Sequence, residues 1–255
     1  FTMLVASTSY KPEIEEEQIR SLVSRGADAL LLIGHDRRPE IYDFLETQGV
    51  PALVTWAFDA ASHRPSVGFD NQRAMQEMAT EVIKLGHKKL ALISAETANN
   101  DRALARRTGI YQAMEDAGLP PHDLQVVETS YGIVEGANAF GEIMGRGQKP
   151  TAVFCGNDVL AVGALRRARE MGISVPQDVS VIGFDDIELA PNALVPLTTV
   201  AQDGYQLGYT ATELVIQECE LPDTHIHQHV LFQPELVERS STAEHPTVRE
   251  KISIA

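Results

Sequence analysis

Residues 151–186, TAVFCGNDVLAVGALRRAREMGISVPQDVSVIGFDD, restrict the fold of this chain more than any other segment. The segment begins with a short apolar run of the kind that forms a buried parallel strand. A Gly-Asn-Asp turn then leads into a stretch with apolar residues at helical spacing, which ends at Gly172. A second apolar run, residues 179–184, follows and ends at two aspartates. The order strand, helix, strand predicts two adjacent parallel strands joined by a crossover helix.

Polar side chains follow both of these strands. Asn157 and Asp158 come after the first strand, and Asp185 and Asp186 come after the second. The carboxyl ends of parallel strands meet at one edge of a sheet, which is where open α/β sheets bind small ligands. The segment therefore predicts a small-molecule site at this edge.

The same alternation of strand and helix patterns continues through the whole chain. It predicts an α/β fold with parallel sheets covered by helices on both faces. At 255 residues the chain has room for one large domain or two lobes, and the number of strands favours two lobes. The predicted strands are residues 3–6, 29–33, 52–55, 90–93, 125–127, 151–154, 179–184, a run near 199, and 229–232. The predicted helices are residues 12–24, 39–47, 71–85, 102–117, 134–144, 158–171 and 205–218.

The charge of the chain argues against direct nucleic-acid binding. The formal net charge is -15, which repels a polyanion such as DNA. The arginines of residues 166–169 lie in a predicted helix and are typical of a solvated helix face. We expect any DNA contact to come from residues outside this chain.

Cysteine usage and hydropathy indicate the compartment. Cys155 and Cys219 are far apart and lack metal-ligand spacing, which favours a reducing compartment without disulfides. Cys155 ends a buried strand and is expected to be a packed thiol. No apolar run is long enough to span a membrane, and no basic segment precedes an apolar one at the start. We therefore expect a cytoplasmic protein without a membrane partner.

Motifs for catalysis and metal binding were not found. The chain has no glycine-rich phosphate loop after a strand, no nucleophile elbow and no metalloprotease histidine pair, so we expect neither enzymatic activity nor a cofactor. His225, His227 and His229 would point to one face of a strand. They fit a polar outward face or a metal site, but no carboxylate or thiolate nearby completes a ligand set, and no metal is expected.

Seven sequence blocks, in order along nearly the whole chain, resemble the ligand-binding core of the LacI/GalR family of bacterial transcription repressors. The blocks are SLVSRGADALLLIG, VGFDNQRAMQEMATEVIKLGHKKLALIS, ARRTGIYQAMEDAGL, AVFCGNDVLAVGAL, GISVPQDVSVIGFDD, PLTTV and LFQPELVERSST. The resemblance implies a type I periplasmic-binding-protein fold with two Rossmann-like lobes.

The resemblance also implies how the lobes divide the chain. Residues 1–87 and 203–232 would form an N-terminal lobe, residues 88–202 and 233–243 a C-terminal lobe, and residues 244–255 a flexible tail. Phe1 aligns with the second strand of the family's core. The family's helix-turn-helix, its hinge and the first strand–helix unit of the core would precede this segment, so the N-terminal lobe is expected to be incomplete.

Three polar residues match effector-binding positions of the family. Arg106 matches the arginine of the R-x-x-G-[FYW] motif, where a guanidinium fork suits vicinal hydroxyls or a carboxylate. Asn157 matches the asparagine of an Asn-Asp turn and Asp185 an effector-binding carboxylate. The alternatives are a surface arginine, a helix N-cap and a turn-forming aspartate. Asp158 could also cap the helix in place of Asn157.

Four further residues are candidates for the same site. Tyr131 matches a position where relatives place an aromatic ring that stacks on the ligand, and the alternative is a surface tyrosine. Asn100 and Asp101 are either rim contacts or helix caps. Trp56 follows a strand at a position where relatives often have an aspartate, and it fits the pocket or the core equally.

Together these features predict the effector-sensing core of a LacI-type repressor. It would bind a small sugar, sugar acid or nucleoside in an interlobe cleft and control DNA binding allosterically. The expected partners are operator DNA, only through the N-terminal domain that is absent here, and a second copy in a homodimer. Apolar surface on residues 71–85 and 190–196 is expected to form the dimer interface. The alternative function is a periplasmic sugar-binding receptor of a transporter, which has the same fold.

Overall fold

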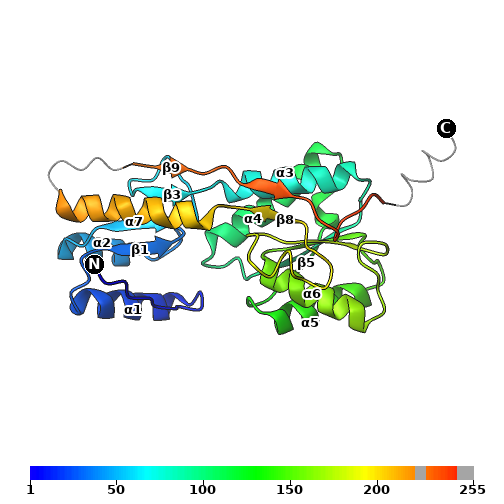
Figure 1. Ribbon diagram of the computed structural model, residues 1–255, viewed down its shortest axis with the longest axis horizontal. Helices are drawn as coiled ribbons and strands as arrows, with labels where there is room; N and C mark the ends of the chain where they lie inside the picture. Colours follow the sequence, from blue (N-terminus) through cyan, green and yellow to red (C-terminus); the bar gives the residue numbers. More distant parts are fainter. Residues whose placement is uncertain (222–227, 246–255) are drawn as a thin grey trace. The chain divides into compact units, whose positions relative to one another are not determined.

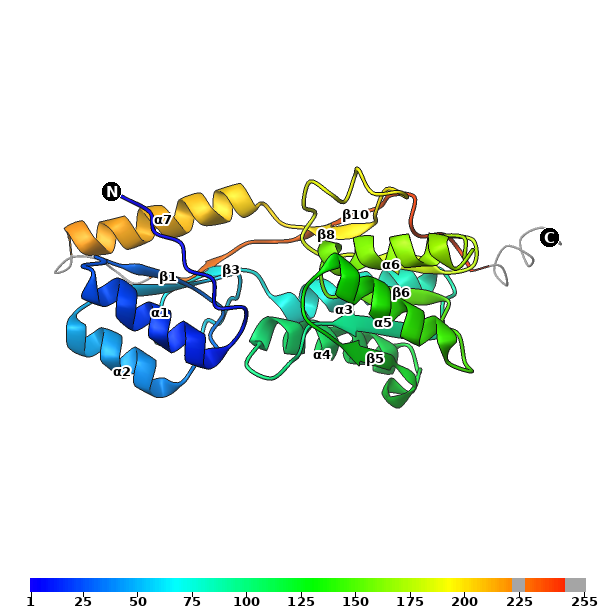
Figure 2. The ribbon, with the colours of Figure 1, turned by 90° about the horizontal axis from the view of Figure 1, so that it is seen from below.

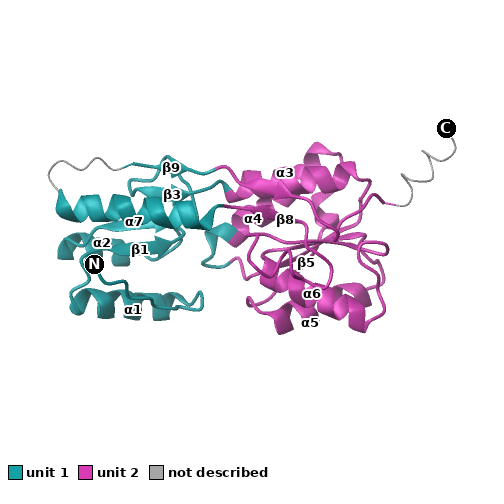
Figure 3. Ribbon diagram, viewed as in Figure 1, with its two compact units in different colours: residues 1–70, 98–102, 203–232 teal, residues 71–97, 103–202, 233–255 magenta. Residues whose placement is uncertain are grey.

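The computed structural model describes residues 1–221 and 228–245, which form two compact α/β units (Figure 1, Figure 3). Unit 1 consists of Phe1–Asp70, Ala98–Arg102 and Asp203–Phe232. Unit 2 consists of Asn71–Thr97, Ala103–Gln202 and the chain from Gln233 onward. Each unit has its own parallel sheet with helices on both faces, which confirms the predicted fold class.

Unit 1 is built on a four-stranded parallel sheet. Its strand order is β1 (Leu30–Ile33), β2 (Ala52–Thr55), β3 (Ser66–Gly68) and β9 (Val230–Leu231). Helices α1 (Pro12–Ser24) and α2 (Pro39–Gln48) cover one face, and α7 (Gly204–Glu220) covers the other (Figure 2). The first face buries Ile19, Leu30, Leu32, Ile41 and Leu45 in one cluster.

The strand predicted for residues 3–6 is wrong. This segment has no regular structure, and the side chains of Phe1 and Met3 are 86% and 85% exposed. An apolar run becomes a strand only when its backbone pairs with a neighbour and one of its faces is covered. Within the described residues, the sheet of unit 1 contains only β1, β2, β3 and β9, so this run has no pairing partner there.

Unit 2 is built on a second four-stranded parallel sheet. Its strand order is β5 (Gln125–Glu128), β4 (Leu90–Ser94), β6 (Ala152–Cys155) and β7 (Ser180–Ile182). Helices α5 (Ile133–Gly145) and α6 (Asp158–Glu170) lie on one face, and α3 (Asn71–Lys84) and α4 (Asp101–Asp116) on the other (Figure 1). A short 3-10 helix, η1 (Pro121–Asp123), precedes β5. Strands β8 (Thr199–Ala201) and β10 (Glu235–Val237) pair antiparallel beside this sheet.

Two glycines let α5 and α6 approach each other at backbone distance. A Cβ at Gly163 would overlap with the carbonyl oxygen of Ile133, and one at Gly136 with the carbonyl oxygen of Leu160. Only glycine fits such a contact. This close packing fixes the position of α6, whose first residues lie at the candidate site.

Helix α3 makes its contacts within unit 2. The Gln76 side chain donates to Asp116 of α4 at 2.9 Å, and Gly109 of α4 leaves no room for a side chain against the backbone of Gln72. These contacts group α3 with unit 2, whereas the sequence analysis placed residues 71–87 in the first lobe. The remaining lobe boundaries stay predictions.

All seven predicted helices are present, with ends that differ by a few residues. Two strands, β3 and β10, were not predicted. Each has three residues and is not part of a longer apolar run, so no pattern distinguishes it from the surrounding loop.

His87 joins four segments at the amino end of the unit 2 sheet. Its side chain is buried, and Nε2 donates to the carbonyl oxygen of Ala243 at 2.9 Å. In this tautomer Nδ1 accepts from the hydroxyl of Thr151 at 3.0 Å, and Ser180 Oγ lies 3.2 Å from Nε2. Burial is the main reason that the pKa of His87 is lowered, and the nearby His245 lowers it further.

We expect the free energy of unfolding to fall as the pH drops below about 6.5. The unfolded chain protonates His87 at its ordinary pKa, whereas the folded protein resists protonation, so stability present above that pH is lost on acidification. Urea titrations from pH 7 to pH 5 should show a weaker pH dependence for His87→Gln than for wild type. His122→Gln is the control, because the His122 side chain is 84% exposed. If the free energy of unfolding depends equally on pH in His87→Gln and in wild type, His87 is not the group responsible.

Candidate functional site

The carboxyl ends of β6 and β7 place two predicted ligand residues at one edge of the unit 2 sheet. The strands pair in parallel, with Val153 opposite Val181 and Phe154 opposite Ile182. Asn157 follows β6 and Asp185 follows β7, and both side chains are partly exposed. Partly exposed polar groups at this edge remain available to a ligand.

Asn157 is the N-cap of α6. Its Oδ1 accepts a hydrogen bond from the backbone N–H of Leu160 at 3.0 Å. The suggestion that Asp158 serves this purpose is wrong, because the Asp158 carboxylate points to other partners. Asn157 thus combines a structural role with a side-chain amide whose N–H groups remain for further hydrogen bonds.

Asp185 and Asp186 form a turn with unusual backbone angles. Their φ angles are 106° and 51°, a region that L residues other than glycine rarely adopt. The Asp185 N–H donates to the carbonyl oxygen of Val200, and Asp185 Oδ1 accepts from Gln202 Nε2, both at 2.9 Å. Asp186 instead forms an ion pair with Arg239 at 2.7 Å, in agreement with a role in the turn. Strain of this kind is characteristic of functional sites.

Arg106 is buried at the centre of a cluster of neutral groups. Only 7% of the residue is exposed, and the guanidinium carbon lies 4.7 Å from the centre of the Phe184 ring. Nη1 donates to Asn71 Oδ1 at 2.7 Å and Nη2 to the Tyr131 hydroxyl at 3.0 Å. The Nε–H group has no partner in the described part of the chain. The structure thus brings Arg106 and Tyr131 together and leaves one buried donor unused.

Sequence reasoning missed Asn71 and Phe184 as parts of this cluster. Asn71 starts α3 and lies 35 positions before Arg106, so no local pattern connects the two. Phe184 reads as the last residue of an apolar strand, and its contact with a guanidinium depends on the tertiary packing. The signal available was that both residues lie within sequence blocks that resemble the family, VGFDNQRAMQEMATEVIKLGHKKLALIS and GISVPQDVSVIGFDD.

Asp158 carries a buried carboxylate behind the Asp185 turn. Oδ1 accepts from the Thr199 hydroxyl at 2.7 Å, and Oδ2 accepts from the Ile187 N–H at 2.9 Å. Burial raises the pKa of Asp158 to about 6, opposed by the two hydrogen bonds and assisted by the negative charges of Asp185 and Asp186. The loss of solvation is therefore only partly offset.

The other three predicted residues lie in unit 1. Trp56 follows β2 with a φ angle of 61° and is partly exposed, and Asn100 is buried. The Asp101 carboxylate accepts from the backbone N–H of His35 at 2.6 Å and from Arg102 Nη1 at 2.7 Å. Asp101 therefore stabilises the chain at the carboxyl end of β1. A ligand contact of Trp56, Asn100 or Asp101 stays a prediction.

His35 is a polar residue at the end of β1 that sequence reasoning overlooked. Its Nε2 is buried without a hydrogen-bond partner in the described residues. Burial is the main cause of a lowered pKa for His35, and it outweighs the opposing effect of Asp101. A single histidine after a strand and a glycine gives no sequence pattern that would have identified it.

The described residues provide neither a metal site nor a reactive thiol at the histidines and the cysteine considered above. Two of the three alternating histidines, His225 and His227, lie outside the described residues, and the Nδ1 atom of His229 is 3.0 Å from Ser66 Oγ. No group of three potential metal ligands occurs in the described ranges. Cys155 is fully buried, and burial strongly raises the pKa of its thiol. It is a packed thiol, as predicted.

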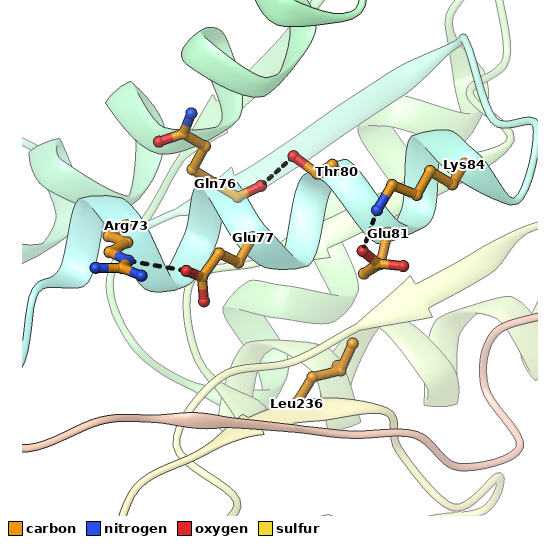
Figure 4. Close-up of a pocket in the computed structure, with 7 residues that line it drawn as sticks. All are labelled: Arg73, Gln76, Glu77, Thr80, Glu81, Lys84 and Leu236. Carbon is orange, nitrogen blue, oxygen red and sulfur yellow. Dashed lines mark hydrogen bonds and ion pairs between the residues drawn. The ribbon is translucent and has the colours of Figure 1, made fainter.

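A groove between α3 and β10 is lined almost entirely by paired polar side chains (Figure 4). Arg73 forms an ion pair with Glu77 at 2.8 Å, and Lys84 with Glu81 at 2.7 Å. Leu236 is the one apolar residue of the lining. Since these charges already have partners within the helix, the groove is a solvated surface. No helix in the described part of the chain is long and apolar enough to cross a membrane.

Comparison with known proteins gives the family. Residues 79–242 match the model of the periplasmic binding protein-like domain. The HTH-type transcriptional regulator DegA of Bacillus subtilis is 32% identical over 247 residues, which are 95% of this chain and 72% of DegA. The repressor PurR of Vibrio atlanticus is 30% identical, over 94% of this chain and 72% of PurR. The chain belongs to the LacI family of transcriptional regulators.

Solved LacI-family structures share the fold. A regulator from Silicibacter pomeroyi has a TM-score of 0.82 at 28% identity and covers 94% of this chain and 87% of its own. A regulator from Enterococcus faecium, solved with bound ribose, has a TM-score of 0.81 at 27% identity over 89% and 84% of the two chains. These LacI-family relatives are transcription regulators and not enzymes, and they do not favour the alternative of a transport receptor.

We expect the substitution Asn157→Ala to lower the free energy of unfolding by about 1 kcal/mol, because α6 loses its N-cap. Asn157→Asp retains an acceptor for the Leu160 N–H and should remain close to wild type. Urea denaturation of the three proteins tests this, and equal stability of the alanine and aspartate variants would refute the capping role.

Proposed function

We propose that this chain is the effector-sensing core of its regulator and that it binds a small sugar or a related metabolite. The effector would bind at the carboxyl end of the unit 2 sheet, in contact with Arg106, Tyr131, Asn157 and Asp185. The observation that carries the proposal is Arg106, a buried guanidinium with an unused Nε–H donor. Leaving a buried donor unpaired is costly, and a ligand oxygen would satisfy it.

The chemistry of the four residues suits a hydroxylated ligand. Asp185 is an acceptor, Asn157 offers amide N–H donors, and Tyr131 presents both a ring and a hydroxyl. Two Arg106 nitrogens already donate to neutral oxygens, those of Asn71 and Tyr131. The structure of the ribose-bound relative supports a sugar as one member of the candidate class.

Regulation would follow from linkage between the effector and the conformation of the core. A ligand shifts a conformational equilibrium only when it binds one state better than the other. We propose that effector binding in this way changes the affinity for operator DNA of the family's DNA-binding domain.

A thermal-shift screen of pentoses, hexoses, sugar acids, purines and nucleosides tests the proposal. A ligand that binds only the folded state raises Tm. For the compound that raises Tm, Asp185→Ala should weaken binding by about 1–3 kcal/mol in titration calorimetry, because the ligand loses a charged hydrogen-bond acceptor. Glu188→Ala removes a charge from an exposed neighbour in the sequence and is the matched control. Equal affinity of Asp185→Ala and wild type would remove Asp185 from the site.

We further propose that the core forms a homodimer through unit 2. The expected apolar surface on α3 is absent, because its apolar side chains are buried and its exposed face is charged. The segment 190–196 remains, since Leu194 is 58% exposed beside an apolar groove lined by Leu165, Ile173 and Val175. Exposed apolar surface of this kind is typical of an interface between identical subunits.

Sedimentation velocity at micromolar concentration should therefore show dimers for wild type and monomers for Leu194→Lys. The lysine would place a charge in an apolar interface. Leu104→Lys, at another exposed leucine of unit 2, should leave the dimer intact. A wild-type protein that is folded and monomeric under these conditions would exclude the proposed dimer.

A further inference from the structure

One buried residue is bonded to both ends of the turn that contains Asp185. Asp158 is 0% exposed, and its N–H donates to the carbonyl oxygen of Phe184 at 2.9 Å. Its carboxylate accepts from the Ile187 N–H at 2.9 Å and from the Thr199 hydroxyl at 2.7 Å. Asp158 therefore connects the start of α6, the turn at residues 184–187 and strand β8.

The turn needs such connections. Both aspartates within it have positive φ angles, and residues in these regions stay there only when the surrounding structure holds them. The Asp185 N–H has one bond, to Val200. Asp158 bonds the carbonyl oxygen of Phe184 and the N–H of Ile187, one group at each end of the turn.

A role in starting α6 does not explain a carboxylate at this position. Asn157 already caps the helix, so the Asp158 side chain is not needed for that purpose. The carboxylate also packs closely against the backbone before the turn, because a Cβ on Gly183 would overlap with Asp158 Oδ1. The two oxygens of the buried Asp158 carboxylate instead hold two donors, the Ile187 N–H and the Thr199 hydroxyl.

The turn also carries the ring that supports Arg106. Phe184 lies directly before Asp185, and its ring is 4.7 Å from the Arg106 guanidinium carbon. A shift of the turn would move the Asp185 carboxylate and the Phe184 ring together. The Asp185 carboxylate and the ring that supports Arg106 thus both depend on the bonds of Asp158.

We propose that Asp158 is a positioning residue that holds residues 184–187 in the geometry required for effector binding. The part that concerns the effector rests on the proposed function, whereas the part that concerns the turn does not. The two parts are therefore tested by separate measurements.

Hydrogen exchange measured by mass spectrometry, without any ligand, tests the turn. Asp158→Ala should speed exchange of the amides of residues 185–188 by about tenfold, which corresponds to the loss of one hydrogen bond. Asp158→Asn should restore slow exchange. Its amide oxygen can accept from Ile187, and its N–H₂ can donate to the Thr199 hydroxyl, which both donates and accepts. A residue needed only for its negative charge would not be rescued in this way.

Thr199→Val is a second variant, in case Asp158→Ala does not fold. It removes one donor of the carboxylate and keeps the side-chain shape, so exchange in the turn should rise by a smaller factor. Strand β4, far along the chain from the turn, serves as the internal reference and should be unaffected. The proposal is overturned if the turn exchanges at the wild-type rate in these variants, or if β4 and the turn accelerate equally.

Titration calorimetry with D-ribose tests the second part. Asp158→Ala should weaken ribose binding by about tenfold or more and Asp158→Asn should restore it, while Asp185→Ala should weaken binding without faster exchange of the turn. If exchange in the turn rises but ribose affinity stays at the wild-type value, Asp158 positions the turn and the proposed role of Asp185 in sugar binding fails. If wild type does not bind ribose, the sugar is excluded and the exchange data alone decide the role of Asp158.

Discussion

Parallel pairing of β6 with β7 is the constraint on which the candidate site depends. The register aligns the two strands so that the residues after them emerge at the same edge of the unit 2 sheet. Asn157 and Asp185 are therefore presented together, although 28 positions separate them in the chain (185 − 157). The backbone contact between α5 and α6 at Gly136 and Gly163 keeps the start of α6 at that edge. Core packing thus decides where the polar groups lie.

Burial of Arg106 among neutral partners is the second feature of the site. A charged group removed from water is costly unless it is paired or hydrogen-bonded. Here the compensation comes from a ring face and from two neutral oxygens, those of Asn71 and Tyr131. The Nε–H group of Arg106 is buried and has no acceptor among the described residues. Asp158 shows the converse, a buried carboxylate held by two uncharged donors.

The sequence predicted those elements of the fold that are long enough to show a periodic pattern of apolar residues. Helices of ten or more residues show the apolar spacing that the core requires, and each was predicted within a few residues of its ends. Strands β3 and β10 have only three residues each and were missed, whereas β7, equally short, was found because it lies in a longer apolar run. The run at residues 3–6 had the composition of a strand but no partner in the described part of the chain. Strand formation depends on a neighbour, which composition does not reveal.

The sequence by itself determined the fold class, the family and the strand ends at which polar residues gather. Those properties follow from periodicity and from turn chemistry, which are local. Only the tertiary structure showed that Asn157 and not Asp158 caps α6, that Asn71 and Phe184 hold Arg106, and that Asp158 joins the turn to β8. These contacts connect residues that lie up to 78 positions apart (184 − 106). Hydrogen bonds and ring contacts at such separations arise from packing, and no local pattern specifies them.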